Sequence, residues 1–334
     1  MVLDRFKKAW GPRICSWIPP RVWHRILNVE LILPYWHSVG DKELDHISGD
    51  YRFRSLEEFK GDLAFFLRYF KPVSLDQIVD HLNGSSSLPQ RCFLPTFDDG
   101  FRESHDAIAP LLAREGLPAA FFLVTSTIDN RELGYLQKKS MLLRRIAEKD
   151  VSNLLTRGTR ILDAAGVFGP DLDARIRAVF YRKRELLDKL GVLFECDFAE
   201  YLSANRPYLT SDQIISLMKQ GFDIGAHSID HPLYSEISLE EQLNQTLGSV
   251  DWLSAKYNFK CRAFSFPYHD SGISLDFFAR VFGEPRLEVT FGGGGIVASC
   301  HPRNMPRFTM ERTSLPASQV LARQYGKALL HRLC

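Results

Sequence analysis

The sequence predicts an α/β fold in which a parallel sheet, closed into a barrel rather than open, is covered by helices. Three observations lead to this prediction. Short, continuously apolar runs alternate with amphipathic helical patterns, which is typical of strands buried between helices. Six or more such units in one chain of 334 residues favour a barrel. Polar residues directly follow several apolar runs, at the carboxyl ends where such folds place their functional groups.

The first part of the chain alternates predicted strands and helices in order. Apolar runs predict buried strands over residues 29–36, 91–97 and 118–126. Helical periodicity predicts helices over residues 55–70, 73–84 and 103–116. The first of these helices begins with a capping box of Ser55 and Glu58, and the last ends at Gly116.

From about residue 131 to 206 the pattern changes, because this stretch is helical, charged and almost free of strand signals. We expect a helical insertion there, so that the chain divides into an N-terminal segment, 1–28, and a barrel domain, 29–334, interrupted by 131–206. Beyond the insertion, strands are predicted over residues 222–227, 261–268 and 287–293. Helices are predicted over residues 209–221, 238–258, 275–283 and 314–333.

Composition excludes some classes of function. Hydrophobic residues make up 45% of the chain and charged residues 25%, as in ordinary globular proteins. The 42 basic and 40 acidic residues leave a formal net charge of +2, which does not suggest a nucleic-acid binder. No apolar run reaches the ~20 residues that span a bilayer. The six cysteines lack CxxC spacing, so we expect reduced thiols and no zinc–thiolate site.

Two histidines and two carboxylates form the main candidate site. His227 and His231 stand four residues apart in "GAHSIDHP", and one helical turn would bring both imidazoles to the same face. Asp98 and Asp99 follow the apolar run "CFLPTF". Two histidines with one carboxylate leave coordination positions free for water and substrate. We therefore expect a divalent cation held by Asp99, His227 and His231.

The second acid then has a separate task. Asp98 would stay off the metal and accept a proton from the metal-bound water, whose pKa the cation lowers towards ~7. The alternatives are structural: Asp99-Gly100 begins a turn, and the two histidines bind nothing. A turn explains Asp99 but leaves Asp98 unexplained.

Three motifs resemble a known family. "TFDDG", "HSIDHP" and "FSFPY" are similar, in this order, to the first three motifs of the polysaccharide deacetylases of the NodB-homology type. The resemblance covers roughly residues 31–130 and 207–311. It implies a distorted (β/α) barrel, one divalent metal ion, with Zn²⁺ as the first candidate and other cations open, and removal of acetyl groups from sugars.

Carried over residue by residue, the resemblance implies that Asp98 is the general base and that Asp99, His227 and His231 bind the metal. The backbone N–H of Tyr268 would share the oxyanion with the metal, because attack on an acetyl carbonyl builds negative charge on its oxygen.

The sequence also departs from the family pattern. Ser265 stands where the family often has an arginine that orients the base, and Arg307 in "MPRFTM" is the candidate replacement. His269 stands where a glycine usually follows the Pro-Tyr pair, and it is expected to reshape a wall of the cleft.

The C-terminal Leu-x-His that usually carries the general acid is not evident. "LPYWHSV" resembles the N-terminal Tyr-His segment of permuted members, which include poly-N-acetylglucosamine deacetylases, although Trp36 intervenes here. His37 would then protonate the leaving amine, a task suited to a group with a pKa near neutrality. The alternative general acid is His301 in "SCHPRN". In the structural alternative, His37 only forms a hydrogen bond at the end of a strand.

Three further segments are less informative. The insertion leaves the barrel on the catalytic face, where it would act as a lid or as a wall of the substrate site. The alternative is that it packs sideways on the barrel or contacts a second copy of the chain. The N-terminal segment mixes Trp10, Trp17 and Trp23 with basic residues, which suits peripheral contact with an anionic membrane or packing on the barrel. "FGGGGI" lacks the Gly-Lys-Ser/Thr ending of a phosphate loop and reads as a strand entering a turn.

These observations predict a metal-dependent deacetylase of an N-acetylated cell-envelope or exopolysaccharide glycan or its precursor. The N-terminus is too interrupted for a signal peptide, so we expect a cytoplasmic protein, with the inner membrane face as a possible contact. The alternative from another class is a glycan-binding protein that keeps the cleft but has lost turnover. Nothing in the sequence indicates the oligomeric state.

Overall fold

A parallel sheet of eight strands forms the centre of the structure, a computed structural model that describes residues 20–283, 285–297, 299–311 and 313–333. The strand order is β10-β9-β8-β7-β6-β5-β2-β11, and every neighbouring pair runs parallel. The strands are β2 (Pro34–Trp36), β5 (Thr96–Phe97), β6 (Ala120–Leu123), β7 (Asp223–Ala226), β8 (Ala263–Ser265), β9 (Val289–Phe291), β10 (Asn304–Met305) and β11 (Phe308–Thr309).

The sheet curls until its two edges meet. β10 and β11 form opposite edges, yet only Pro306 and Arg307 separate them in the sequence. Consecutive Cα atoms lie about 3.8 Å apart, so two residues cannot bridge an open sheet of this width. The stretch from β10 to β11 thus pairs first with β9 and then with β2. Arg307 lies between these two pairings, where the edges of the sheet meet. The predicted barrel is confirmed, in a distorted form.

The distortion has a local cause in two of the predicted strands. The runs 29–36 and 91–97 each split in two, because Pro34 and Pro95 interrupt the ladder of N–H donors. The first halves leave the barrel for a second, three-stranded sheet of order β1-β4-β3. Its strands are β1 (Leu31–Ile32), β4 (Cys92–Phe93) and β3 (Lys71–Pro72).

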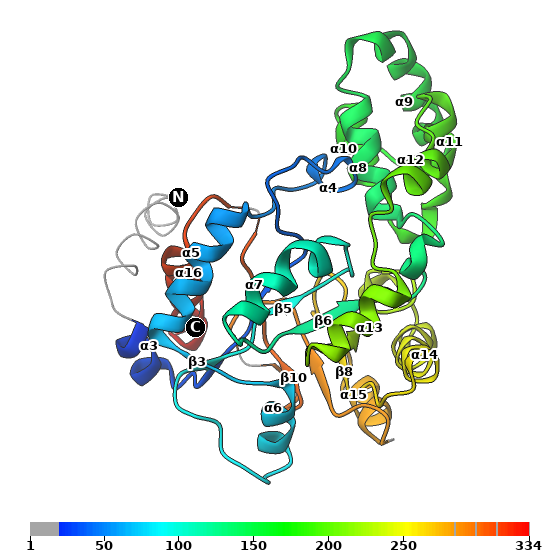
Figure 1. The fold of residues 1–334 in the computed structure, drawn as a ribbon. Coiled ribbons are helices and arrows are strands. Elements are labelled where there is room, and N and C mark those ends of the chain that lie inside the picture. Colours follow the sequence, from blue (N-terminus) through cyan, green and yellow to red (C-terminus); the bar gives the residue numbers. More distant parts are fainter. Residues whose placement is uncertain (1–19, 284, 298, 312, 334) are drawn as a thin grey trace.

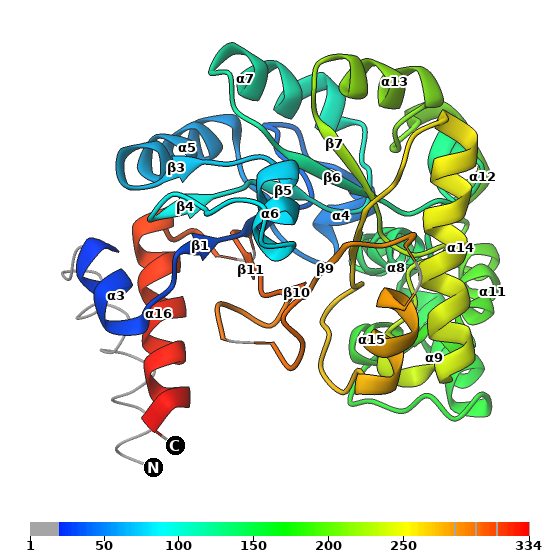
Figure 2. The ribbon, with the colours of Figure 1, turned by 90° about the horizontal axis from the view of Figure 1, so that it is seen from below.

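Helices surround the strands, as Figure 2 shows for α5, α7, α13 and α14. The predicted capping box of Ser55 and Glu58 begins α5, and a second capping box, of Thr210 and Gln213, begins α13. The helices of this layer are α5 (Leu56–Tyr69), α6 (Leu75–Leu82), α7 (Ala109–Arg114), α13 (Ser211–Lys219), α14 (Leu239–Tyr257), α15 (Leu275–Phe282) and α16 (Ala317–Leu333). Most of their apolar faces belong to one large core cluster. Leu75, Ile78 and Val79 of α6 pack in a second cluster with strand residues such as Phe122 and Phe291.

The predicted helices of residues 131–206 form a lobe that projects from the barrel (Figure 1). They are α8 (Tyr135–Arg145), α9 (Leu155–Ala164), α10 (Leu172–Arg177), α11 (Glu185–Leu193) and α12 (Phe198–Asn205). α8 packs against the short helix α4 (Asp45–Ser48). The contact is close: the Ser140 hydroxyl donates to the Asp45 carbonyl at 2.8 Å, and a Cβ on Gly49 would lie 2.1 Å from the Ser140 carbonyl oxygen. The lobe is thereby attached to the loop that follows β2.

Most of the predicted N-terminal segment, residues 1–19, lies outside the described residues. Its described part, α3 (Pro20–Leu27), packs against α16, with the Trp23 ring stacked 5.6 Å from that of Tyr325. Across the described residues, no helix combines the length and hydropathy that a bilayer crossing requires.

Candidate active site

The parallel strands bring the predicted site residues to one edge of the barrel. Asp98 and Asp99 follow β5, His227 follows β7, and His37 follows β2. Parallel strands end at the same edge of a sheet, so residues distant in sequence converge there.

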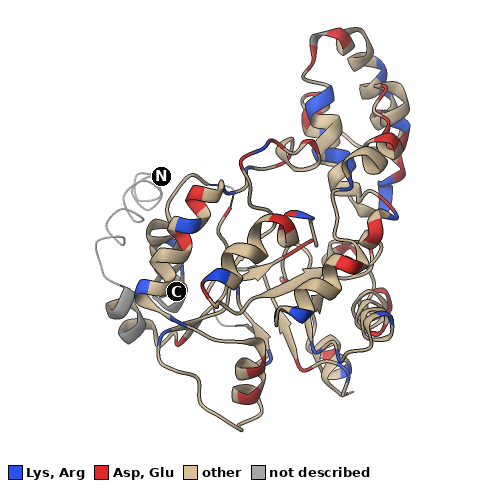
Figure 3. Cartoon of the chain, viewed as in Figure 1, with Lys and Arg blue, Asp and Glu red and all other residues tan. Residues whose placement is uncertain are grey.

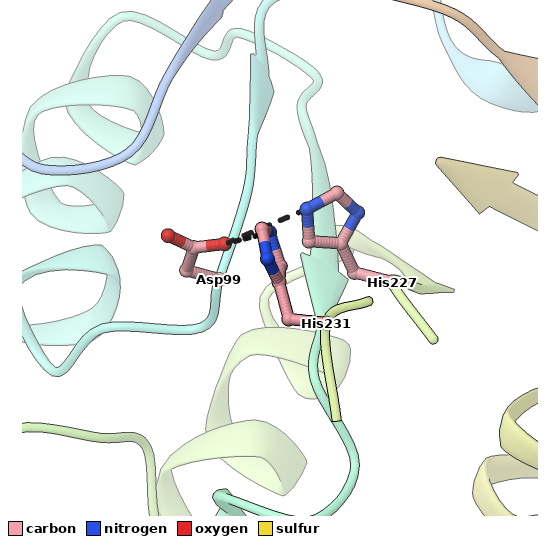
Figure 4. Close-up of side chains that lie close together, drawn as sticks. All are labelled: Asp99, His227 and His231. Atoms are coloured by element: carbon pink, nitrogen blue, oxygen red, sulfur yellow. Dashed lines mark ion pairs between the residues drawn. The ribbon is translucent and has the colours of Figure 1, made fainter. Parts of the chain in front are cut away.

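Asp99, His227 and His231 form the only group among the described residues with the geometry to hold a metal ion. Their ligand atoms lie within 4.8 Å of one another. The Oδ1 atom of Asp99 lies 3.5 Å from the Nε2 atom of His227 and 3.3 Å from that of His231. Figure 4 shows the carboxylate facing both imidazoles. All three side chains are largely withdrawn from solvent.

The donor chemistry fits a cation between these groups. The Nδ1 atom of His227 bonds the Ser265 carbonyl at 2.8 Å, so Nδ1 carries the proton and Nε2 presents a lone pair towards Asp99. Burial lowers the pKa of His227 to about 4, which keeps the ring neutral, as a metal ligand must be. The Oδ1 atom of Asp99 is buried without a hydrogen bond from any described residue. Oδ1 of Asp99 and Nε2 of His227 are both acceptors, and a cation between them would stabilise their close approach of 3.5 Å.

The two histidines do not share a helical turn, so the predicted helical geometry of His227 and His231 is wrong. Residues 228–231 form a loop in which Ser228 and His231 have φ values of 70° and 64°. The Ser228 hydroxyl accepts a hydrogen bond from the backbone N–H of His231 at 3.0 Å, which closes the loop. Asp99 and Tyr268 also have positive φ, 72° and 59°. Each such conformation costs about 1–3 kcal/mol, and such outliers cluster at functional sites.

Asp98 pairs with Arg307 and is not one of the three residues that could hold a metal ion. Nη1 of Arg307 donates to Oδ1 of Asp98 at 2.9 Å, and Nη2 donates to Oδ2 at 2.7 Å. Asp98 is 2% exposed and Arg307 is 1% exposed. Burial opposes the ionisation of Asp98, but the Arg307 guanidinium, together with His227 and His37, outweighs burial and lowers the pKa of the carboxyl group.

The space around Arg307 explains two features of the sequence. Ser265 is small enough to leave room for the guanidinium, and its hydroxyl accepts from Nη2 of Arg307 at 2.5 Å. The glycine run holds the other side: the Gly292 carbonyl accepts from Nε of Arg307 at 3.2 Å. A Cβ on Gly292 would lie 2.4 Å from the Asp270 carboxyl group. Close packing therefore accounts for glycine at position 292.

Tyr268 presents an available backbone donor at the site. Its N–H donates to no described residue. Its side-chain hydroxyl bonds the hydroxyl of Tyr135 on α8, so the insertion reaches this side of the site. The two rings of Tyr268 and His231 lie 5.0 Å apart.

His37 is held by a residue that the sequence reasoning missed. The buried Glu311 carboxylate accepts from the backbone N–H groups of His37 and Ser38, at 3.0 and 3.1 Å, and bonds Nδ1 of His37. Burial lowers the pKa of His37, but the charge and hydrogen bond of Glu311, together with the charges of Asp99 and Asp98, outweigh burial and raise the pKa to about 9. The imidazole is therefore protonated at neutral pH.

The alternative acid occupies different surroundings. The His301 ring stacks on Phe278 and Phe282, with ring centroids 5.1 and 4.8 Å away. It lines neither of the two cavities beside the metal group, whereas His37 lines one of them.

Two cavities meet at the metal group. The catalytic cavity, about 160 Å³, is lined by His37, Asp98, Tyr268 and His269 among others. The insertion cavity, about 340 Å³, lies between the barrel and the helical lobe. Both are lined by Asp99, Leu136, Gln137 and His231.

Comparison with known proteins gives matches of three kinds. A family model described as polysaccharide deacetylase matches residues 85–161 and 174–275, which together exceed half of the chain. A poly-beta-1,6-N-acetyl-D-glucosamine N-deacetylase of Escherichia coli K12 is 28% identical over 121 residues, 34% of this chain and 18% of that protein. The protein of the same name from Escherichia coli O157:H7 is 30% identical over 95 residues, which are 28% of this chain and 14% of that protein. The chain thus matches less than a fifth of the length of these relatives.

Solved structures resemble the whole fold. The Streptococcus pyogenes deacetylase PplD in complex with acetate has a TM-score of 0.55 at 12% identity, over 91% of this chain and 97% of that one. IcaB from Ammonifex degensii has a TM-score of 0.54 at 15% identity, over 88% of this chain and 97% of that one. At these identities the likeness concerns the fold alone.

Proposed function

Because the chain belongs to the polysaccharide deacetylase family, we propose that it is a metal-dependent hydrolase that removes acetyl groups from an N-acetylglucosamine-containing glycan. The sugar rests on the relatives, whose name specifies poly-beta-1,6-N-acetyl-D-glucosamine. One observation carries the proposal: a three-ligand group stands beside a separate carboxylate that is buried and held ionised.

Asp99, His227 and His231 would hold the divalent cation, with Zn²⁺ as the first candidate for this set of two nitrogens and one oxygen. When bound, the cation would polarise the acetyl carbonyl and lower the pKa of a coordinated water molecule.

Asp98 is proposed as the general base that takes the proton from the attacking water. Arg307 binds both carboxylate oxygens, which fixes their orientation and keeps the group ionised, and each oxygen retains a lone pair for the proton. The backbone N–H of Tyr268 would donate to the oxygen on which negative charge develops, since no described residue uses that donor.

His37 is proposed as the general acid that protonates the leaving amine. Glu311 holds its Nδ1, which leaves Nε2 for the substrate, and the raised pKa keeps a proton available at neutral pH. The histidine and the base line the same cavity.

Acetate release from N-acetylglucosamine oligomers tests the proposal. We expect release by the zinc-loaded protein, loss after treatment with a chelator and recovery when the metal is restored. Metal binding without acetate release from any acetylated glycan would instead support a glycan-binding protein of the same fold.

A further inference from the structure

The insertion cavity adjoins the catalytic cavity, because four residues line both. Its walls come from the barrel and from α8 and α11 of the helical lobe, and Asp99 and His231 are among the shared lining residues. A volume of about 340 Å³ falls within the range of small-molecule sites, ~300–1,000 Å³. A group covalently attached to a sugar in the catalytic cavity has room to extend into it.

A buried amide stands where the two cavities meet. Gln137 is 8% exposed and lines both. Its Oε1 accepts from the Tyr208 hydroxyl at 3.1 Å, and that hydroxyl accepts from the backbone N–H of Gly134 at 3.0 Å. The Nε2 of Gln137 donates to no residue in the described part of the chain. Tyr208 therefore fixes the amide so that its N–H donors remain for a ligand in the cavities.

The charge of the insertion cavity favours a cation. Asp188 is paired with Lys138 at 2.6 Å, and Asp230 with Arg184 at 3.6 Å. Two further carboxylates on the lining, Glu132 and Glu185, form no ion pair or hydrogen bond with a described residue. With Asp99 reserved for the metal, the lining carries four acids against two bases.

We propose that the insertion cavity is a subsite for the sugar next to the one being deacetylated, and that it prefers this neighbour as the free amine. Gln137 donates to a hydroxyl oxygen of the neighbouring sugar, and Glu132 and Glu185 accept from its ammonium group. The inference rests on the proposed function, because N-deacetylation itself produces the ammonium-bearing sugar. A glycan that already carries one deacetylated residue is then a better substrate than a fully acetylated one, and an anionic neighbour is disfavoured.

The test compares kcat/KM for the fully acetylated disaccharide of N-acetylglucosamine with that for its two mono-deacetylated forms. We expect one mono-deacetylated form to be preferred about threefold to tenfold at low salt, and the preference to shrink as salt screens the charges. The double variant E132Q/E185Q brings the ratio close to one. The matched control E195Q/E200Q removes two exposed lobe charges that do not line the cavity, and it keeps the ratio.

The variant Q137L affects the turnover of the fully acetylated and the mono-deacetylated disaccharides alike, because the lost donor serves the neighbouring sugar whether or not that sugar carries an amine. We expect a higher KM with little change in kcat. Turnover of all disaccharides without any preference overturns the subsite and leaves the proposed function intact.

If no disaccharide is hydrolysed, the proposed function fails while the subsite is still measurable. Calorimetry of the zinc-loaded protein with the fully deacetylated disaccharide then decides. Binding that is lost in E132Q/E185Q and kept in E195Q/E200Q supports the subsite, and absence of binding to the unaltered protein overturns it.

Discussion

The barrel edge and the helical lobe lie on opposite sides of the insertion cavity, and their ion pairs differ in how deeply they are buried. On the barrel edge, the Asp98 and Arg307 side chains are 3% and 1% exposed and are joined by two hydrogen bonds. Along the helices of the lobe, basic and acidic residues are interspersed, as Figure 3 shows, and the Asp173 and Arg177 side chains of one ion pair are 49% and 43% exposed. This difference matches the two proposed tasks, which are catalysis by fixed buried groups on the barrel edge and recognition of a neighbouring sugar by solvated groups on the lobe.

The same contrast predicts unequal energies for similar contacts. A buried charge that loses its partner stays desolvated, which costs about 3–5 kcal/mol. An exposed pair is screened by water and is worth about 0–1 kcal/mol.

The largest effect is expected for Asp98→Asn. The amide cannot accept the proton from the attacking water, so kcat should fall by about 10²–10⁴-fold on an acetylated oligomer. Bound metal, measured on the same sample, should be retained because Asp98 is outside the ligand group. A variant with near wild-type kcat would show that the base lies elsewhere.

Arg307→Met is expected to lower stability most. It leaves the buried Asp98 without its cation, and the free energy of unfolding should fall by about 3–5 kcal/mol. Denaturant unfolding measures the change. A loss below about 1 kcal/mol would mean that the pair contributes no more than a surface contact.

Glu311→Gln should change the pH profile of the reaction. The proposed acid works while His37 is protonated, so activity should fall as pH rises through about 9. Without the Glu311 carboxylate, burial dominates and the basic limb should move to lower pH, towards or below the ordinary value of about 6.5. His37→Ala should remove this limb. An unchanged limb in the Glu311→Gln variant would indicate that another group sets it.

The smallest effect is expected for Asp173→Asn on the lobe. This exposed pair with Arg177 spans one helical turn, so the loss should be about 0.3–0.5 kcal/mol. It is the control for Arg307→Met under the same unfolding conditions. Equal losses in the two variants would remove the energetic distinction between the regions.

The sequence was informative where local pattern and strand order decide the structure. Alternating apolar runs and helical periods predicted the barrel, and strand-end positions brought Asp98, Asp99 and His227 to one edge. The resemblance to the family pointed to Arg307, because Ser265 stands where the family often has an arginine, and the structure places the Arg307 guanidinium against the Ser265 hydroxyl.

Other features depend on contacts that no local pattern encodes. Glu311 is a single acid in "FTMERTS", and only the pairing of β11 with β2 places it beside His37. The split strands follow from a change of pairing partner at two prolines, which leaves each apolar run looking continuous in the sequence. The loop at His231 keeps the spacing of a helical turn without its geometry, because Ser228 closes it through a side-chain bond. The amide of Gln137 gains its place only when the lobe folds over the barrel.

Calorimetric titration of the metal-free protein with Zn²⁺ tests the central claim most directly, since every proposed role depends on one cation shared by an acid and two imidazoles. We expect one tight equivalent of Zn²⁺ to bind the unaltered protein and Asp98→Asn. For His231→Ala we expect an affinity loss larger than the ~10–100-fold that loss of an outer contact causes. Equal affinities in the unaltered protein and His231→Ala, or no binding to the unaltered protein, would contradict this claim.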